Sequence, residues 1–523
     1  MIEKESQNSS QNQSPNGLRE SSSSSSSSNG ELVFVTWDDN DPLNPVNWST
    51  KYKYYMTTMA VLMSFFAATC AGIYGQGEHQ MMKEFGVSRE ITILGISVFP
   101  LGYGIGPLIL APLSELWGRN SVYFVSYFVF IILFLPQALA KNITTVIVSR
   151  FLAGLAASTS ATMVGGTIAD MFRTENRGPP MALFGAMTMS GTGFGPLIGG
   201  FIVENPNMGF RWLSWIQMIL NGSLYILLLI TFKETRNSIV LKSKAQKLRK
   251  ETGNQNIVAP IEVEHTQILE LMRVSLFRPI KFLFTEPIVF FFALWISFTW
   301  GILYLFLKSV GQVFSASHGF GPSQVGLTFL GVIVGGIIGA LTNPLQEYYV
   351  AKSSIRNGGK HQPESRLIMS AIAGILFCAG LFLFGWTSGP QHPWIAPVIG
   401  MTMVAFAIHA IYTAVFNYLA DCYSIYASSA LAGQSFARNM FGCAFPLFSE
   451  QMNSRLGFQW SMSLLGFLGI ILTTTPFILI WKGPQIRARS KVSMKLIEMQ
   501  PDDTREGDME FEEEIIGHVS PNR

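Results

Sequence analysis

Charged residues are scarce in this chain of 523 residues. Asp, Glu, Lys and Arg together make up 13% of it, whereas an ordinary soluble domain contains about 25%. The net charge of +3 is small, so the composition gives no support to nucleic-acid binding. Because the chain is also 49% hydrophobic, we expect a membrane protein.

Motifs for catalysis and cofactor binding are also missing. The four cysteines have no paired spacing and lie in or beside apolar runs, so neither a disulfide framework nor a metal site is expected; they are Cys70, Cys378, Cys422 and Cys443. No G-x-x-x-x-G-K-[ST] sequence is present, which argues against pumping driven by nucleotide hydrolysis. The first fifty or so residues are polar, so we expect no cleavable signal peptide. The sequence therefore predicts neither an enzyme nor a bound cofactor.

The chain does contain many apolar runs of membrane-crossing length. A helix needs about 20 apolar residues to cross the hydrocarbon core. Twelve runs satisfy this, near residues 53–74, 91–112, 120–140, 145–169, 181–203, 212–232, 287–308, 325–346, 367–386, 394–418, 428–449 and 460–481. The predicted fold class is an all-α membrane protein of twelve transmembrane helices.

Polar segments divide the chain into five regions. These are a disordered tail (1–50), a six-helix half (51–232), a central loop (233–286), a second six-helix half (287–482) and a disordered tail (483–523). The serine-rich start cannot bury enough apolar surface to become ordered. In the central loop, apolar residues at helical spacing from Ile268 to Leu276 predict a short amphipathic helix on the inner membrane face.

Positive charge is concentrated in the loops that follow even-numbered spans. Those loops carry Arg119, Arg173, Arg177, the lysines of the central loop, Lys352, Arg356, Lys360 and Arg366. Positive loops stay in the cytoplasm, so both termini and the central loop are expected there. The glycosylation sequon at Asn142 falls in an external loop, which agrees with this orientation and makes Asn142 a candidate for glycosylation.

A short repeat relates the two halves. The expected loop after span 2 reads APLSELW (Ala111 to Trp117), and the expected loop after span 8 reads NPLQEYY (Asn343 to Tyr349). Proline, leucine, glutamate and an aromatic residue recur at matching offsets. Such a sequence repeat is expected when two pseudo-symmetric six-helix halves face each other across a site at the membrane midplane.

The first copy of the repeat leads into a candidate gate. Glu115 and Arg119 flank Gly118, and an acid and an arginine beside a tight glycine turn can pair in one transport state and separate in the other. Asp170, at the inner end of span 4, is in a position to join them. We expect a cytoplasmic gate from these four residues; the alternative is a loop with ordinary positive-inside charge.

Two arginines lie within predicted spans. Arg150 is in span 4, where a charge is costly unless it faces a cavity or a partner. Its alternative is an arginine that extends to the outer interface, because it lies about a turn from the start of the span. Arg438 lies in span 11. We expect a functional role for both arginines.

Polar and aromatic faces in the second half predict a substrate cavity. A polar stripe on an apolar helix must face protein or water, and dense aromatics suit flat, apolar or cationic ligands. The candidates are Trp300 and Tyr304 of span 7, His409, Tyr412, Phe416 and Asn417 of span 10, and Gln434 of span 11. His409 could carry the proton, but a histidine facing a helix neighbour is more often only hydrogen-bonded.

One face of span 5 is a row of glycines. Gly191, Gly195 and Gly199 recur every four residues, so another helix can approach to backbone contact. Pro196 removes a backbone donor beside that stripe, and Gly200 follows. The alternative is helix packing alone, since small-residue stripes are common in membrane bundles.

Three of these sequences resemble motifs of the major facilitator superfamily. The gate segment is similar to motif A, except that Ala111 and Glu115 replace its opening glycine and its aspartate. R-x-x-x-G from Arg150 to Gly154 resembles motif B, whose arginine is associated with proton coupling; on this resemblance we assign proton coupling to Arg150 and Arg438. G-x-x-x-G-P-x-x-G-G from Gly191 resembles motif C of the antiporters. The resemblance implies the twelve-helix fold of that superfamily and export against an inward flow of protons.

Segments near both ends of the chain resemble one particular family within this superfamily. The segment from Trp37 to Trp48, W-D-x-x-D-P-x-N-P-x-N-W, and the later Asn417 to Asp421 and Phe445 to Phe448 are similar to fungal twelve-span drug:proton antiporters, the group with cycloheximide, fluconazole and polyamine exporters. This implies efflux of toxic organic compounds, small-molecule substrates and protons as partners besides the lipid bilayer, a plasma-membrane location and a monomer.

The carrier of the proton is not identified by the sequence. No Asp or Glu lies in the middle of a predicted span, and the acids at span ends, such as Glu78, Glu204 and Glu450, are the candidates. Two alternatives to drug efflux remain. One is export of a single physiological solute, such as a polyamine or a secreted metabolite; the other is a transport-inactive membrane sensor.

Overall fold

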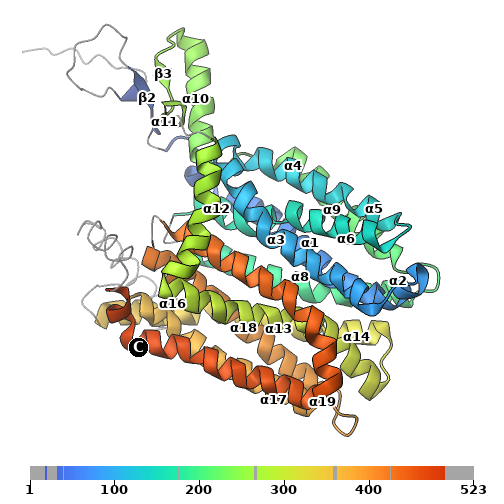
Figure 1. The fold of residues 1–523 in the computed structure, drawn as a ribbon. Helices are drawn as coiled ribbons and strands as arrows, with labels where there is room; N and C mark the ends of the chain where they lie inside the picture. Colours follow the sequence, from blue (N-terminus) through green and yellow to red (C-terminus); the bar gives the residue numbers. More distant parts are fainter. Residues whose placement is uncertain are drawn as a thin grey trace, which may run out of the picture.

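The computed structural model describes residues 18–19, 32–38, 40–173, 176–263, 268–356, 362–423 and 426–488. Long helices lie side by side in a bundle (Figure 1). They run between one end that carries α10 (Asn237–Thr252) and α16 (Asn343–Arg356) and an opposite end that carries α2 (Glu78–Phe85) and α14 (Pro322–Thr328). We call these the α10 end and the α2 end. Eleven helical segments in the described residues are long and apolar enough to cross a membrane, so the chain is an integral multi-pass membrane protein.

The first half contains the helices expected from the sequence, with several spans made of two pieces. They are α1 (Thr50–Ile73), the 3-10 turn η2 (Tyr74–Gly77), α2, α3 (Arg89–Trp117), α4 (Arg119–Ile132), α5 (Phe134–Ala138), α6 (Ile143–Ala157), α7 (Thr159–Met171), α8 (Gly178–Glu204) and α9 (Arg211–Thr231). The APLSELW segment, expected in a loop, is the last part of α3. That helix ends only where Gly118 takes a φ of 89°, a conformation that residues with a Cβ rarely adopt.

The second half has one unusually long element. Its helices are α13 (Pro287–His318), α14, α15 (Leu330–Leu341), α16, the 3-10 turn η4 (Pro363–Arg366), α17 (Leu367–Trp386), α18 (Ile395–Tyr423) and α19 (Ala427–Arg487). α19 has 61 residues with non-helical backbone at Gly457, so the last two predicted spans lie in its two legs (Figure 1). The NPLQEYY segment is helical in α16, which also corrects the expectation of a loop.

The segment before α1 packs against the central region. β2 (Val33–Val35) pairs antiparallel with β1 (Leu18–Arg19) and parallel with β3 (Ile257–Val258). Val35, Ala245, Ile257 and Ala259 form a small separate core. The expectation of a disordered 1–50 tail is therefore wrong for residues 32–38, whose apolar side chains pack on β3 and α10 more than 200 residues later. It is also wrong for residues 40–49, where Asp41 pairs with Lys244 and the 3-10 turn η1 (Pro45–Asn47) contacts α7. Residues 1–17 and 20–31 lie outside the described residues.

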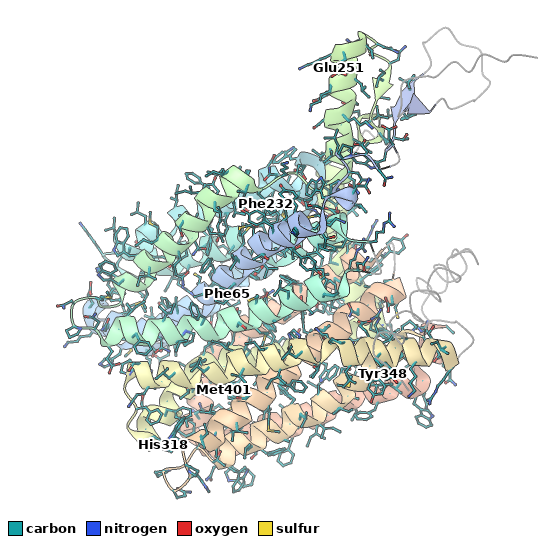
Figure 2. The ribbon with its side chains drawn as sticks, turned by 180° about the vertical axis from the view of Figure 1, so that it is seen from behind. Phe65, Phe232, Glu251, His318, Tyr348 and Met401 are labelled. Carbon is teal, nitrogen blue, oxygen red and sulfur yellow. The ribbon has the colours of Figure 1, made fainter. Side chains whose placement is uncertain are left out.

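The central region is more helical than expected. α10 projects from the bundle, with Glu251 near its far end (Figure 2). α11 (Pro260–Val263) is one short turn, and α12 (Ile268–Thr285) continues well past the predicted amphipathic helix. The expected disordered tail from residue 483 also begins as helix, because α19 continues to Arg487, whose guanidinium pairs with Glu364 at 2.8 Å. Residues 489–523 lie outside the described part of the chain.

The outer surface of the bundle is apolar. Large hydrophobic side chains are widely exposed there, among them Ile230, Leu341, Phe284 and Trp481. Exposure of so much contiguous apolar surface to water is unfavourable, so these helix faces are expected to contact the hydrocarbon core of a membrane. Polar side chains are instead buried inside the bundle.

Candidate functional site

A cavity of about 420 Å³ lies between the two halves. Each half contributes three helices to it: α3, α7 and α8 from the first, and α13, α18 and α19 from the second. The lining residues are Tyr103, Ala161, Phe184, Gly185, Thr188, Met189, Trp300, His409, Tyr412 and Arg438. The structure thus brings together three of the predicted cavity residues and adds Arg438, which the sequence assigned to proton coupling.

Arg438 lies between two aromatic rings of the cavity wall. Its guanidinium carbon is 4.4 Å from the ring centroid of Trp300 and 5.1 Å from that of Tyr412. One terminal nitrogen donates to Ser435 Oγ at 3.4 Å, and Nε has no hydrogen-bond partner among the described residues. The residue is 5% exposed. A buried, weakly hydrogen-bonded cation therefore faces the cavity.

His409 is held between the two halves by glycines. A Cβ on Gly339 of α15 would lie 2.7 Å from the imidazole, and a Cβ on Gly185 of α8 would lie 2.9 Å from it. Only glycine leaves room for the ring at both positions. Within the described ranges, neither imidazole nitrogen has a hydrogen-bond partner.

The remaining predicted cavity residues are near the cavity without lining it. Tyr304 packs against Gly442, where a Cβ would lie 3.1 Å from its ring. The Phe416 ring is 6.1 Å from that of Tyr412. Gln434 is buried and Asn417 half-buried. Helical periodicity places these side chains on a broad face but does not tell which part of that face is open.

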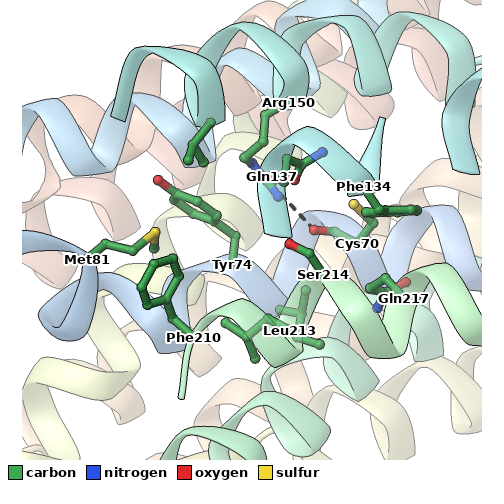
Figure 3. A pocket seen from close by; sticks show the side chains of 12 residues that line it. Cys70, Tyr74, Met81, Phe134, Gln137, Arg150, Phe210, Leu213, Ser214 and Gln217 are labelled. Atoms are coloured by element: carbon green, nitrogen blue, oxygen red, sulfur yellow. Dashed lines mark hydrogen bonds between the residues drawn. The ribbon is translucent and has the colours of Figure 1, made fainter. Parts of the chain in front are cut away.

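Arg150 lines a second cavity, of about 370 Å³, within the first half. Its Nε donates to the carbonyl oxygen of Gly95 at 2.5 Å. A terminal nitrogen donates to the carbonyl oxygen of Cys70 at 3.4 Å, as Figure 3 shows. The guanidinium carbon lies 4.2 Å from the ring centroid of Tyr74 and 5.2 Å from that of Phe99. Arg150 is 2% exposed, so the alternative of an arginine extending to the interface is wrong.

An ion network joins the halves at the α2 end. Lys308 of α13 donates to both carboxylate oxygens of Glu78 on α2. Arg89, which begins α3, lies 2.8 Å from Glu78 and 2.6 Å from Glu450 of α19. Glu78 and Lys308 are both buried. The sequence analysis did not pair these residues; the available signal was a lone lysine inside the apolar run of span 7.

Arg119 and Asp170 of the predicted gate meet at the α10 end. Arg119 Nε donates to Asp170 Oδ2 at 2.5 Å. Glu234, which the sequence analysis missed, accepts from the backbone N–H groups of Arg119 and Asn120 at 3.1 and 3.0 Å, which places a carboxylate at the amino terminus of α4. Glu115 is exposed, so the arginine takes Asp170 as its ion-pair partner.

The second half has a matching ion pair. Arg366, immediately before α17, donates from Nε to Asp421 Oδ2 at 2.5 Å, and its NH1 lies 3.3 Å from Glu347. Glu347 belongs to the NPLQEYY copy of the repeat. Both halves therefore have an arginine–aspartate ion pair at the α10 end, beside the two copies of the sequence repeat.

The glycine stripe of α8 is a contact between backbones. A Cβ on Gly191 would lie 2.3 Å from the carbonyl oxygen of Phe65, and one on Gly195 would lie 2.5 Å from that of Thr69, both on α1. A Cβ on Gly199 would lie 2.9 Å from Gln76. On the other side of α8, a Cβ on Gly200 would lie 2.3 Å from the carbonyl oxygen of Pro322 in the second half. α8 runs as one helix through Pro196 and is packed between α1 and the opposite half.

Asn142 has a structural role beside its sequon. Its side-chain oxygen accepts from the backbone N–H of Thr145 at 2.8 Å, which caps the amino terminus of α6. The residue is exposed, so it remains a candidate for glycosylation.

A membrane-spanning bundle whose two halves share a mostly apolar cavity has the architecture of a transporter rather than an enzyme. The chain matches the sequence profile of the Major Facilitator Superfamily over residues 60–444. It is 39% identical over 457 residues to the MFS-type transporter paaT of Penicillium rubens, covering 87% of this chain and 83% of that one. It is 34% identical over 459 residues to the multidrug transporter FLU1 of Candida albicans, covering 87% and 75%. The chain therefore belongs to the major facilitator superfamily, and within it to the fungal drug-efflux family.

A solved structure supports the fold. The xylose transporter XylE from E. coli, in a partially occluded inward-open conformation, superposes with a TM-score of 0.58 at 16% identity, covering 83% of this chain and 98% of that one. The superfamily fold predicted from the sequence motifs is confirmed.

Proposed function

We propose that this protein is a proton-coupled antiporter that exports toxic organic compounds by alternating access. The observation that carries the proposal is the cavity between the halves, which three helices of each half line. A site shared in this way changes its access when the halves rock against each other. Membership of the fungal drug-efflux family supports the direction of transport.

The α10 end is the cytoplasmic end in this proposal. Arg119, Arg173 and Arg366 lie there, together with the lysines of α10, and positive charge is retained on the cytoplasmic side. Both termini are then cytoplasmic, and the plasma membrane is the site at which an exporter removes a compound from the cell. The proposed state of assembly is a monomer.

The ion pairs at the two ends are the proposed gates. Opening the cavity to the outside requires Lys308 to leave Glu78, because this pair joins one half to the other at the α2 end. The pairs of Arg119 with Asp170 and of Arg366 with Asp421 each hold helix ends within one half, so they can fix the shape of that half while it rocks.

Glu78 is the proposed proton acceptor. Separating it from Lys308 while both are charged would leave two uncompensated charges in a low-dielectric region. A proton on Glu78 removes its charge and so weakens its attraction to Lys308. Arg89 of α3 and Glu450 of α19 face the same carboxylate region, so the proton enters a network of two acids and two bases. This assigns coupling to one of the acids at span ends.

Arg150 is proposed to connect this network with the interior of the first half. The Tyr74 ring lies against the Arg150 guanidinium, and Glu78 follows Tyr74 by about one helical turn. A change at Glu78 thus reaches Arg150 through a packed aromatic ring.

Export of a secreted metabolite uses the same cavity and remains the second candidate. The polyamine version of that alternative loses support, because the lining contains Arg438 and none of its residues is an acid. A polycation requires carboxylates at its binding site.

The test is flux in proteoliposomes that contain the purified chain. Vesicles loaded with candidate compounds are given a pH gradient, and both the compound and the internal pH are followed. Efflux that accelerates with the gradient and is accompanied by proton movement is expected. Movement of compound with no proton movement would overturn the coupling, and no movement of any compound would favour the sensor.

A further inference from the structure

The cavity between the halves has an unusual charge balance. The guanidinium of Arg438 lines this cavity, that of Arg150 lines the second cavity, and both residues are almost fully buried. In the described ranges, the partners of Arg438 are two aromatic rings and one serine hydroxyl. Arg150 is bound by backbone carbonyls and rings. A buried cation without a carboxylate is costly unless something else supplies the negative charge.

Carboxylates on the lining helices are too far away to supply it, because each lies nine or more residues along its helix from the nearest lining residue; they are Glu90 and Glu115 on α3, Asp170 on α7, Glu204 on α8, Asp421 on α18 and Glu450 on α19. Asp170 follows Ala161 on α7, and Asp421 follows Tyr412 on α18, by nine residues in each case, which is about 13 Å along a helix. On α19, Glu450 lies about 18 Å along the helix from Arg438. Asp170, Asp421 and Glu450 are each already paired with another arginine.

We propose that the cavity takes planar aromatic compounds that carry one carboxylate, with Arg438 as the residue that selects the anion. This inference rests on the proposed function in placing the transported compound in this cavity, and it names the substrate class. A guanidinium with unused N–H groups can donate two parallel hydrogen bonds to a carboxylate. Its Nε is one such group.

The walls of the cavity suit a flat ring beside that carboxylate. Trp300 and Tyr412 flank the guanidinium, and Phe184 and Tyr103 come from the opposite half. Aromatic faces in offset or edge-to-face contact stabilise a planar ligand.

His409 adds a polar contact that does not depend on the carboxylate. Both of its ring nitrogens lack a hydrogen-bond partner among the described residues, and it lies on the cavity wall. A hydroxyl or carbonyl group on the ligand would satisfy one of them. The site therefore combines an anion contact, flat apolar walls and one neutral hydrogen-bonding position.

The experiment compares three ligands that differ in charge and little in shape. Binding of 2-naphthoate, 2-naphthamide and 2-naphthylmethylammonium to the purified full chain is measured by titration calorimetry at one pH and ionic strength. Naphthoate is expected to bind about tenfold or more tightly than the amide, because a charge-assisted pair replaces a neutral one. The ammonium compound is expected to bind most weakly.

Substitutions at two positions of α19 test whether Arg438 causes the preference for the anionic ligand. Arg438→Gln should abolish the preference for naphthoate over naphthamide, whereas Arg438→Lys should keep a reduced preference. Arg455→Gln, which removes an exposed cation from the same helix, should bind all three ligands as the native chain does.

Several outcomes would overturn the inference. These are equal affinity for the three ligands, tighter binding of the ammonium compound, no binding of any of them, or an anion preference that survives in Arg438→Gln. The comparison of ligands on the native chain does not depend on any variant folding. Equilibrium binding also needs no gradient, so selective naphthoate binding without proton-linked flux would refute the coupling and leave the substrate class standing.

Discussion

Lys308 donates to both carboxylate oxygens of Glu78, and this one contact neutralises a buried charge of the second half with a buried charge of the first. The two residues are 230 positions apart in the chain. A contact of this kind cannot remain intact while the halves separate at the α2 end. It therefore connects the charge state of Glu78 with the conformation of the whole bundle.

Glu78→Gln should abolish efflux driven by a pH gradient. Removal of the carboxylate leaves the Lys308 ammonium buried without its main partner, and breaking a buried pair typically lowers stability by about 3–5 kcal/mol. Flux in proteoliposomes and the thermal unfolding temperature in detergent measure the two effects.

A double variant separates stability from coupling at this site. Glu78→Gln combined with Lys308→Met removes both charges, so stability should recover most of the loss. Coupled efflux should stay absent, because the proton acceptor is gone. Coupled efflux that returns in the double variant would show that Glu78 only holds the structure together.

Arg150→Ala should abolish coupled transport while the protein is still produced and inserted. The substitution removes the donor to Gly95 and the cation against the Tyr74 ring. Arg150→Lys should keep only part of the activity, since an ammonium cannot reproduce the planar guanidinium contacts. Flux per inserted molecule is the measurement, and unchanged efflux in Arg150→Ala would remove this residue from the mechanism.

Gly195→Ala should destabilise the first half and slow transport. Its new Cβ would lie 2.5 Å from the carbonyl oxygen of Thr69, so α1 and α8 would have to move apart, and overpacking of this kind costs about 1–3 kcal/mol. Gly222→Ala on α9 is the matched control, because a Cβ there meets nothing within 4 Å. Thermal unfolding of both variants distinguishes steric contact from a general effect of alanine, and equal melting temperatures would contradict the packing argument.

Asp170→Asn should weaken the α10 end of the first half. It removes the anion that Arg119 Nε contacts at 2.5 Å, a loss of about 1–3 kcal/mol for a hydrogen bond to a charged group. Glu115→Gln is the control, because Glu115 is exposed and surface substitutions usually change stability by less than about 0.5 kcal/mol. Transport and unfolding temperature should fall in the first variant only. A larger effect in Glu115→Gln would show that Glu115, and not Asp170, is the more important acid of the gate.

Lys244→Ala should release the segment before α1 from α10. Lys244 Nζ lies 2.7 Å from Asp41 and 2.9 Å from Asp38. Hydrogen exchange of residues 40–47 should rise in this variant and not in Lys247→Ala, which removes an exposed lysine of the same helix. Equal exchange in both variants would show that the ion pairs do not hold the segment.

The same contact has a defined pH range. Burial raises the pKa of Asp41, but the hydrogen bonds from Lys244 and from the Leu43 N–H outweigh burial and hold that pKa below its ordinary value. Burial lowers the pKa of Lys244, and its two carboxylate partners raise it above its ordinary value. Stability from Asp41 is thus lost as the pH falls below about 4, and stability from Lys244 is lost above about pH 10.4. Protection of the segment should be constant between these limits; a loss near pH 7 would contradict the assignment.

Much of the bundle could be predicted because span length and hydrophobicity are local properties. The positions of the helices, the close contact along Gly191, Gly195 and Gly199, and the arrangement of Trp300, Tyr412 and His409 on one cavity all follow from periodicity. Contacts between distant segments do not. Nothing local indicates that Lys308 would reach Glu78, or that Glu234 would accept from the start of α4.

The errors have physical causes of the same kind. Segments with charged residues were expected to be loops, but α3 and α16 continue as helices beyond the apolar run, because backbone hydrogen bonds in a helix do not require apolar side chains. The β2 strand was expected to be disordered, because its three apolar residues are too few to predict a core until their partners in β3 and α10 are known.

The pairing of β2 with β3 has a consequence for how the protein is made. Thr36 accepts from Lys244, 208 positions later, and β3 lies later still. During synthesis, the ribosome must therefore complete all of α1 to α9 before the small sheet can close. The pairing of β2 with β3 can therefore form only after every helix of the first half has been synthesised.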